Sequence, residues 1–524
     1  MFKRLNLSLI NTVYVCFMIV YMAVREVTAL NFLINSNILS AAIFLFGAIL
    51  IFADLLTSRK CLKGRTQDLL ILFLVICGVS SIINIKLGLF DNIKFIAAIA
   101  IEYFVFFCFV KEDSKEEITK KLNITTATLI VTWSVILLCS VMMYFFNIDI
   151  TIMGRGSFGQ ANQGFSTEYS RLWGILQDPN YAGATSIISI FASLRFIFIN
   201  KKVGVRILNV LNIALQMIYI ILGGSRAALL LLFAAIVLYA IYKFILSEKK
   251  RTVAKVLKGV LLTGLTVVIC AVAVFGTKAG LPYVKAMVFS KDSSVTRFVL
   301  SSYTKLYSAS GYEFEVVSPI IGENGKPYPG DTSDEDPSDT TTPDKPIQDI
   351  GRTDLEKEDV SNGRFTRWQQ TLEIFLKAPI FGTSPRNLTA FARINNPDTL
   401  MARFSIAPHN GYLDVLVETG IVGFGVLASV IILALFTAIK NLFRSSFSSN
   451  IAFSLLAVIV LAGIAFFVSD VFMLFSMNSM LFWLFLGFAY NYGAEHKSGE
   501  LCHVVYSKTV GRLTDKIFSK KEQI

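Results

Sequence analysis

The sequence predicts an all-α integral membrane protein with about twelve transmembrane helices. Hydrophobic residues make up 54% of the 524 residues and charged residues only 16%, a balance too apolar for a water-soluble globule. Twelve mainly apolar windows are long enough to cross a hydrocarbon core of about 30 Å. They cover residues 9–30, 36–56, 67–84, 91–110, 122–146, 180–199, 206–223, 225–246, 257–276, 410–439, 450–470 and 471–492.

The first window follows Lys3 and Arg4, as the apolar segment of a signal peptide would. It is longer than such a segment, however, and it is followed by Arg25 and Glu26 rather than by a small-residue cleavage site. We therefore expect it to be retained as a membrane span.

The distribution of Lys and Arg predicts that both termini are cytoplasmic. Short cytoplasmic connections accumulate these residues, and an even number of spans places the basic connections and the basic tail on that side. The short outer connections carry only Arg25, Lys86, Arg155, Arg171 and Arg226. The net charge of +12 then reflects topology and contact with anionic lipids, and we expect no nucleic-acid partner.

These observations divide the chain into four parts. Residues 1–276 hold nine spans, 277–409 form a large extracytoplasmic loop, 410–492 hold three more spans, and 493–524 form a basic cytoplasmic tail. Each cysteine lies in an apolar window or on the cytoplasmic side, so disulfides are not expected.

The large loop has two different halves. Residues 322–360 are rich in Asp, Thr, Pro and Gly, and they lack the apolar side chains that would offset the entropy of ordering, so a flexible insert is predicted. An acidic calcium loop is the alternative, but the segment lacks the glycine and terminal glutamate of an EF-hand. Residues 362–378 have helical periodicity, with Phe365, Trp368, Leu372 and Phe375 on one face, and this amphipathic helix should lie in the outer membrane interface.

Arginines at the outer surface run against the positive-inside bias. Five are found at span ends or on the interfacial helix: Arg155, Arg171, Arg226, Arg364 and Arg367. Taken singly, each is explained by snorkelling or by contact with a lipid phosphate. Together they indicate a site for a phosphorylated, membrane-bound ligand, because the permanently charged guanidinium matches phosphate oxygens two at a time.

His409 is the single histidine expected on the outer side. It precedes the tenth span, and with an ordinary pKa of about 6.5 a neutral imidazole there can take a proton from a sugar hydroxyl. The alternative is a structural histidine bonded to backbone at the start of the helix. No phosphate-binding loop pattern occurs, and one outer histidine without an outer cysteine does not favour a zinc site. Paired carboxylates for glycoside hydrolysis stay an alternative, although the outer acidic residues concentrate in the acidic insert. No metal or other cofactor is predicted.

Four segments resemble the bacterial O-antigen ligase and Wzy-type polysaccharide polymerase superfamily. The first runs from Gly363-Arg364 through Trp368 to Pro379 and Gly382. The second comprises His409-Asn410-Gly411-Tyr412-Leu413 followed by Glu418-Thr419-Gly420. Two shorter ones are Gly224-Ser225-Arg226 and Arg171 with Asp178-Pro179-Asn180. The acidic insert at 322–360 departs from the shorter loop typical of the superfamily.

The resemblance implies a GT-C-like fold and a metal-independent membrane glycosyltransferase at the outer face of the bacterial cytoplasmic membrane. Its donor would be undecaprenyl-diphosphate-linked oligosaccharide, with a flippase and a chain-length regulator as further partners. The family pattern assigns the diphosphate to Arg171, Arg226 and Arg364, and the acceptor hydroxyl to His409. By position alone, Arg155 and Arg367 are added to the predicted binding residues. Trp368 would stack against a sugar ring, and Asn410 would fix the histidine or the start of the helix. Glu418 is expected to be structural.

The function predicted first is a polymerase that joins lipid-linked repeat units into capsule, exopolysaccharide or O-antigen. A ligase of the same superfamily, which moves finished glycan to lipid A core, a protein or another surface acceptor, is the nearest alternative. A transporter or flippase of lipid-linked glycan would need more charge within the spans. A structural scaffold would tolerate loss of single arginines.

Overall fold

The computed structural model describes residues 7–31, 37–153, 160–166, 169–246, 252–289, 293–317, 363–473 and 475–492. The chain forms two compact units. The terminal unit comprises Met1–Met22, Asn35–Leu129 and Ser361–Ile524, and the central unit comprises Ala23–Ile34 and Ile130–Val360. The predicted binding residue Arg155, the acidic insert and the basic tail lie outside the described residues.

Nine helices in the described part of the chain are long and apolar enough to cross a membrane. They are α1 (Leu7–Arg25), α3 (Asn37–Leu56), α4 (Arg65–Ile83), α6 (Lys115–Phe145), α7 (Pro179–Ile199), α8 (Val203–Leu222), α9 (Arg226–Ile241, continued by the π-turn η6, Tyr242–Leu246), α10 (Val253–Phe289) and α15 (Gly411–Leu442). Helices satisfy every backbone polar group internally, which lipid requires. A multi-pass membrane protein is therefore confirmed.

The three remaining predicted windows contain shorter helices. They are α5 (Leu89–Ile101) with the π-helix η5 (Glu102–Phe107), α16 (Ser448–Ile464) and α17 (Met477–Asn491). The count of twelve spans stays a prediction.

Helix α17 forms the centre of the terminal unit, because all of its residues are buried. The indole ring of Trp483 packs edge-on against Tyr103 of η5, with 4.5 Å between ring centroids. A side chain at Gly487 would meet the carbonyl oxygen of Phe107 at 2.4 Å, so this glycine allows η5 to approach α17 closely.

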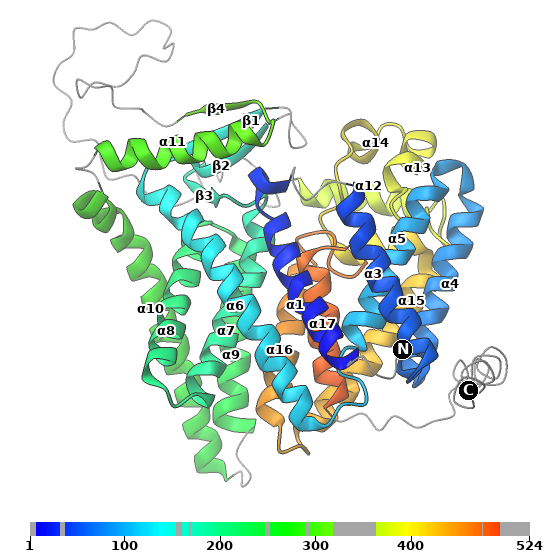
Figure 1. The fold of residues 1–524 in the computed structure, drawn as a ribbon, viewed down its shortest axis with the longest axis horizontal. Coiled ribbons are helices and arrows are strands. Elements are labelled where there is room, and N and C mark those ends of the chain that lie inside the picture. Colours follow the sequence, from blue (N-terminus) through cyan, green and yellow to red (C-terminus); the bar gives the residue numbers. More distant parts are fainter. Residues whose placement is uncertain are drawn as a thin grey trace, which may run out of the picture. The chain divides into compact units, whose positions relative to one another are not determined.

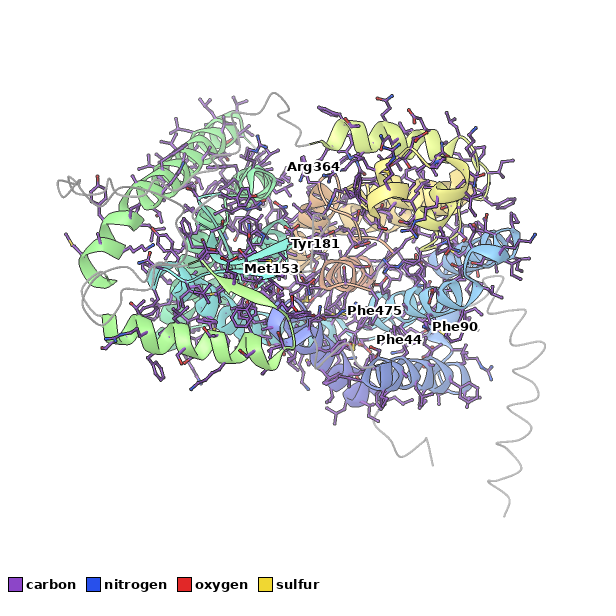
Figure 2. The ribbon with its side chains drawn as sticks, turned by 90° about the horizontal axis from the view of Figure 1, so that it is seen from above. Phe44, Phe90, Met153, Tyr181, Arg364 and Phe475 are labelled. Atoms are coloured by element: carbon purple, nitrogen blue, oxygen red, sulfur yellow. The ribbon has the colours of Figure 1, made fainter. Side chains whose placement is uncertain are left out.

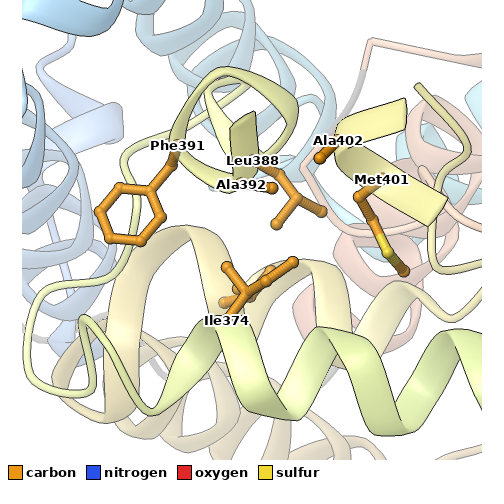
Figure 3. Packing of buried hydrophobic residues seen from close by; sticks show 7 residues of the cluster. Ile374, Leu388, Phe391, Ala392, Met401 and Ala402 are labelled. Carbon is orange, nitrogen blue, oxygen red and sulfur yellow. The ribbon is translucent and has the colours of Figure 1, made fainter. Parts of the chain in front are cut away.

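Three short helices cover one end of α15 in the terminal unit (Figure 1): α12 (Arg364–Phe375), α13 (Leu388–Asn395) and α14 (Leu400–Phe404). We call them the cap. Ile374 of α12 is fully buried against residues of α13 and α14 (Figure 3), and Val417 of α15 completes this core. The cap is thus joined to α15 by apolar packing, while Phe365 and Leu372 of α12 are exposed, as an interfacial helix requires.

The central unit contains a four-stranded antiparallel sheet that the sequence analysis did not predict. Its order is β3 (Arg171–Gly174), β2 (Gln160–Ser166), β1 (Asp149–Met153) and β4 (Phe314–Val316). Thr151 of β1 pairs with Asn162 of β2 on one side and with Glu315 of β4 on the other. The sheet and α11 (Ser293–Ala309) lie beyond one end of α6, α7 and α8 (Figure 1), and the Tyr307 hydroxyl donates to Gln163 at 2.8 Å.

Helix α10 continues past residue 276, where the predicted outer loop begins, and ends at Phe289. With a rise of 1.5 Å per residue its 37 residues span about 55 Å. This length exceeds the hydrocarbon core of about 30 Å, so α10 is longer than an upright membrane span requires.

Candidate functional site

In the central unit, Arg171 at the start of β3 is held by protein acceptors. Its Nε donates to the carbonyl oxygen of Gly223 at 2.6 Å, and its Nη2 donates to Oδ1 of Asn180 at 3.1 Å. The guanidinium also lies 5.0 Å from the ring centroid of Trp173. Arg171 is only 7% exposed, so its contacts are those of a buried structural residue.

Asn180 also connects this arginine to the turn before α9. The Ser225 hydroxyl donates to Asn180 Oδ1 at 2.8 Å and caps α9 by accepting from the backbone N–H of Ala228. Arg226 is the first residue of α9, and its side chain is exposed. The two short motifs therefore form one network that positions an exposed arginine at a helix N-terminus, where the helix dipole favours anions.

In the terminal unit, α12 carries the predicted basic residues on its first turns. Figure 2 shows Arg364 at the start of this helix. Its guanidinium carbon lies 5.6 Å from the ring centroid of Phe467. This cation–π contact fixes the direction of the side chain.

Arg367 and Trp368, on the same helix, each hold a buried donor. Arg367 Nε and Trp368 Nε1 have no hydrogen-bond partner within the part of the chain that the structure describes. Burial lowers the pKa of Arg367 from its ordinary value, yet a guanidinium remains charged at physiological pH. Buried donors without partners are rare in folded proteins, and a ligand that offers oxygen atoms would satisfy both.

His409 is held in a left-handed backbone conformation, with φ of 53°, immediately before α15. Asn410 caps that helix, because its Oδ1 accepts from the backbone N–H groups of Tyr412 and Leu413 at 3.0 and 3.2 Å. The structure therefore gives Asn410 the predicted role of fixing the start of the helix. Non-glycine residues seldom adopt positive φ, and such conformations cluster at functional sites.

Arg364 and the His409 segment are built on the same connection between α16 and α17. The backbone N–H of Gly411 donates to the carbonyl oxygens of Ala465 and Val468, at 2.7 and 2.9 Å. Phe467, between them, is the ring that Arg364 contacts. The connection between α16 and α17 thus contacts both Arg364 and the backbone that follows His409.

Backbone hydrogen bonds join the segment after α12 to a break in α15. The N–H of Ile421 donates to the carbonyl oxygen of Pro379 at 2.9 Å, and that of Thr383 donates to Val417 at 2.9 Å. The break lies at Gly420, where φ is 68° and ψ is −177°. A Cβ at Gly420 would lie 2.1 Å from the carbonyl oxygen of Ile380, so the glycines of the two longer motifs permit this contact.

The terminal unit also contains a cavity of about 310 Å³ that was not predicted from the sequence. Its polar lining includes Arg386, Asp414, Glu418, Ser469 and Asp470. The spacing of Asp414 and Glu418, one helical turn apart, indicated a shared face. Nothing in the sequence indicated that Arg386 and Asp470, from two other segments, would join them.

The protein thus combines membrane-spanning helices with basic residues at the starts of α9 and α12. Acidic residues line a cavity next to the start of α15. Residues 211–428 match the family model described as O-antigen ligase. The match extends from within α8 into α15 and includes Arg226, Arg364, Arg367, Trp368, His409 and Asn410. It confirms the resemblance to the O-antigen ligase and Wzy-type superfamily and indicates a membrane enzyme of glycan transfer. No curated protein matches the chain.

Proposed function

We propose that the protein is a polysaccharide polymerase that transfers undecaprenyl-diphosphate-linked glycan onto a hydroxyl of another lipid-linked repeat unit. The product would be capsule, exopolysaccharide or O-antigen. The reaction would take place on the extracytoplasmic face of the bacterial cytoplasmic membrane, with both termini in the cytoplasm. The superfamily match over residues 211–428 supports glycan transfer as the reaction class.

The observation that carries the proposal is the set of donors on α12. Arg364 is oriented by Phe467, and the buried Arg367 Nε and Trp368 Nε1 have no partner among the described residues. A glycosyl diphosphate offers the phosphate and sugar oxygens that such donors require. Guanidinium groups would stabilise the charge that accumulates on the diphosphate as it leaves.

The reaction needs one bond to form and one to break. The acceptor hydroxyl oxygen would attack the anomeric carbon, and the bond from that carbon to the phosphate oxygen would break, with both electrons going to the diphosphate. His409 would take the hydroxyl proton as general base, and Asn410 holds the helix start beside it. In the central unit, Arg226 would bind diphosphate and Arg171 would hold the turn before it.

A ligase of the same superfamily is the second candidate, because the matching family model carries that description. The donor and the leaving group would be the same. The acceptor would be lipid A core, a protein or another surface molecule instead of a second repeat unit, so the product separates the two functions.

The test is the size distribution of lipid-linked glycan in cells that carry wild-type protein, a deletion, His409→Ala or Arg364→Ala at matched membrane levels. We expect single repeat units to accumulate in the deletion and in both variants, with long polymer in wild type. Arg403→Ala is the matched control, because this exposed arginine of α14 forms its ion pair with the exposed Asp398, and polymer in cells with this variant should be normal.

Two results would redirect the assignment. Long lipid-linked chains that no longer reach their final acceptor in the deletion and in His409→Ala would identify a ligase. Normal polymer in both variants, with loss only in the deletion, would favour a scaffold and contradict the proposed enzyme.

A further inference from the structure

The cavity in the terminal unit lies against the backbone that carries His409. Pro408 and Gly411, on either side of His409 and Asn410, both line it. Its volume of about 310 Å³ is at the lower end of the range of roughly 300–1,000 Å³ for small-molecule sites. A ligand of one or two sugar rings is therefore the size to consider.

Acidic side chains outnumber basic ones around the cavity. Asp414, Glu418 and Asp470 line it together with Arg386. Carboxyl oxygens suit the hydroxyl groups of a sugar, whereas the basic residues of α12 would attract an anionic diphosphate.

Asp414 provides the observation that indicates a ligand. Its Oδ2 is buried and has no hydrogen-bond partner among the described residues, although the residue lines an open cavity. A buried carboxylate oxygen without a donor is costly. A ligand that brings hydroxyl or ammonium hydrogens into the cavity would remove that cost.

The remaining lining suits a sugar better than a metal ion. Within the described ranges, no group of three or more His, Cys, Asp or Glu side chains is arranged to hold a metal. Phe95, Phe472 and Met473 supply apolar wall, which can face the C–H surface of a pyranose while carboxylates accept from its hydroxyls. Mixed apolar and convergent polar lining is typical of ligand sites.

We infer that this cavity is the acceptor subsite, which binds a neutral or amino sugar through Asp414 and presents its hydroxyl beside His409. The inference rests on the proposed function for the role of that sugar. It assigns the two substrates to different residues: the diphosphate donor to the arginines and the hydroxyl-bearing acceptor to the acidic residues of the cavity.

Binding can be measured without turnover. Protein in lipid nanodiscs is titrated with methyl glycosides of neutral hexoses and amino hexoses, and contact is read by saturation-transfer difference NMR. We expect at least one glycoside to bind wild type, and Asp414→Asn to weaken it about five- to tenfold, because an amide nitrogen that only donates replaces an oxygen that can accept from a sugar hydroxyl. Asp414→Asn keeps the side-chain shape, so folding should be retained.

Two further variants give a steric test and a control. Ala407 is exposed and lines the cavity, so Ala407→Trp should abolish glycoside binding without altering a charge. Asp398→Asn changes an exposed aspartate of the same unit, 89% accessible at its side chain, and should bind glycosides as wild type does.

Donor binding provides the second readout. Undecaprenyl diphosphate should bind Asp414→Asn with wild-type affinity. No glycoside binding by wild type, equal affinity in wild type and Asp414→Asn, or parallel loss of glycoside and undecaprenyl diphosphate would each overturn the subsite. Failure of the proposed function is distinct: glycosides would still bind through Asp414, while cells with His409→Ala would still make normal polymer.

Discussion

Arg171 and Arg226 were both predicted to hold the diphosphate, but the structure gives them different surroundings. Arg171 is buried and donates to Gly223 and Asn180, whereas Arg226 is exposed at the start of α9. We expect Arg171 to act mainly as a positioning residue. Arg226 would then make the contact with the ligand.

A double-mutant cycle tests this difference. Arg171→Lys keeps the charge but loses the planar fork that reaches two acceptors, so it should be destabilising by about 1.5–3 kcal/mol. Combined with Asn180→Ala, the loss should be less than additive, with a coupling of about 0.5–3 kcal/mol, measured by denaturation of the purified protein. Unchanged stability of Arg171→Lys, together with weaker binding of undecaprenyl diphosphate, would make Arg171 a direct ligand instead.

Motif residues could be named from the sequence because each has a local signal: arginine at an outer span end, or histidine before a helix. Their partners could not be named. Phe467 lies about a hundred residues from Arg364, and Asp470 and Arg386 reach the cavity from segments with no shared periodicity. Such contacts depend on tertiary packing, which a single sequence does not display.

At the scale of elements, α15 shows how a continuous apolar pattern can conceal a break. Residues 410–439 were predicted as one span, and their hydropathy does not distinguish Gly420 from Gly425. The structure places a left-handed residue at Gly420, where the segment from Pro379 to Gly382 crosses the helix and hydrogen bonds to it. Glycine is required there by the crossing chain.

Gly420→Ala should therefore be strongly destabilising, while Gly425→Ala should not. The added methyl group would clash with the Ile380 carbonyl oxygen and force a strained φ, at a cost of about 2 kcal/mol or more. Nothing lies within 4 Å of a Cβ at Gly425, in the same helix. Thermal unfolding of the solubilised protein measures both, and equal stability of the two variants would contradict the role assigned to the break.

At the scale of the whole molecule, hydropathy predicted the membrane helices because each must satisfy its backbone internally in lipid. The sheet was not predictable by the same means. Its strands are three to seven residues long, and β1 pairs with β4 from a distant part of the chain. Alternation is confined to stretches as short as Ile150-Thr151-Ile152 and Phe314-Glu315-Val316, and the pairing of distant segments defines the strands.

The proposed topology predicts which surfaces face the outside of the cell. Asp398→Cys, between α13 and α14, should react with a membrane-impermeant maleimide in intact cells. Arg444→Cys, in the connection after α15, should react only after the membrane is permeabilised. Unmodified wild-type protein gives the background from its own cysteines, and the opposite labelling pattern would place the candidate site on the cytoplasmic side.

The burial of α17 has a consequence for biosynthesis. Its 15 residues are fewer than the roughly 20 that an independent span needs, and every one of them is covered by protein. Helix α17 is the last of the described helices in the chain. During synthesis, the surfaces of η5 and α16 that pack against it therefore stay uncovered until α17 has left the ribosome. The terminal unit is therefore completed late, and a chain interrupted before Met477 presents those uncovered surfaces to the proteases of cellular quality control.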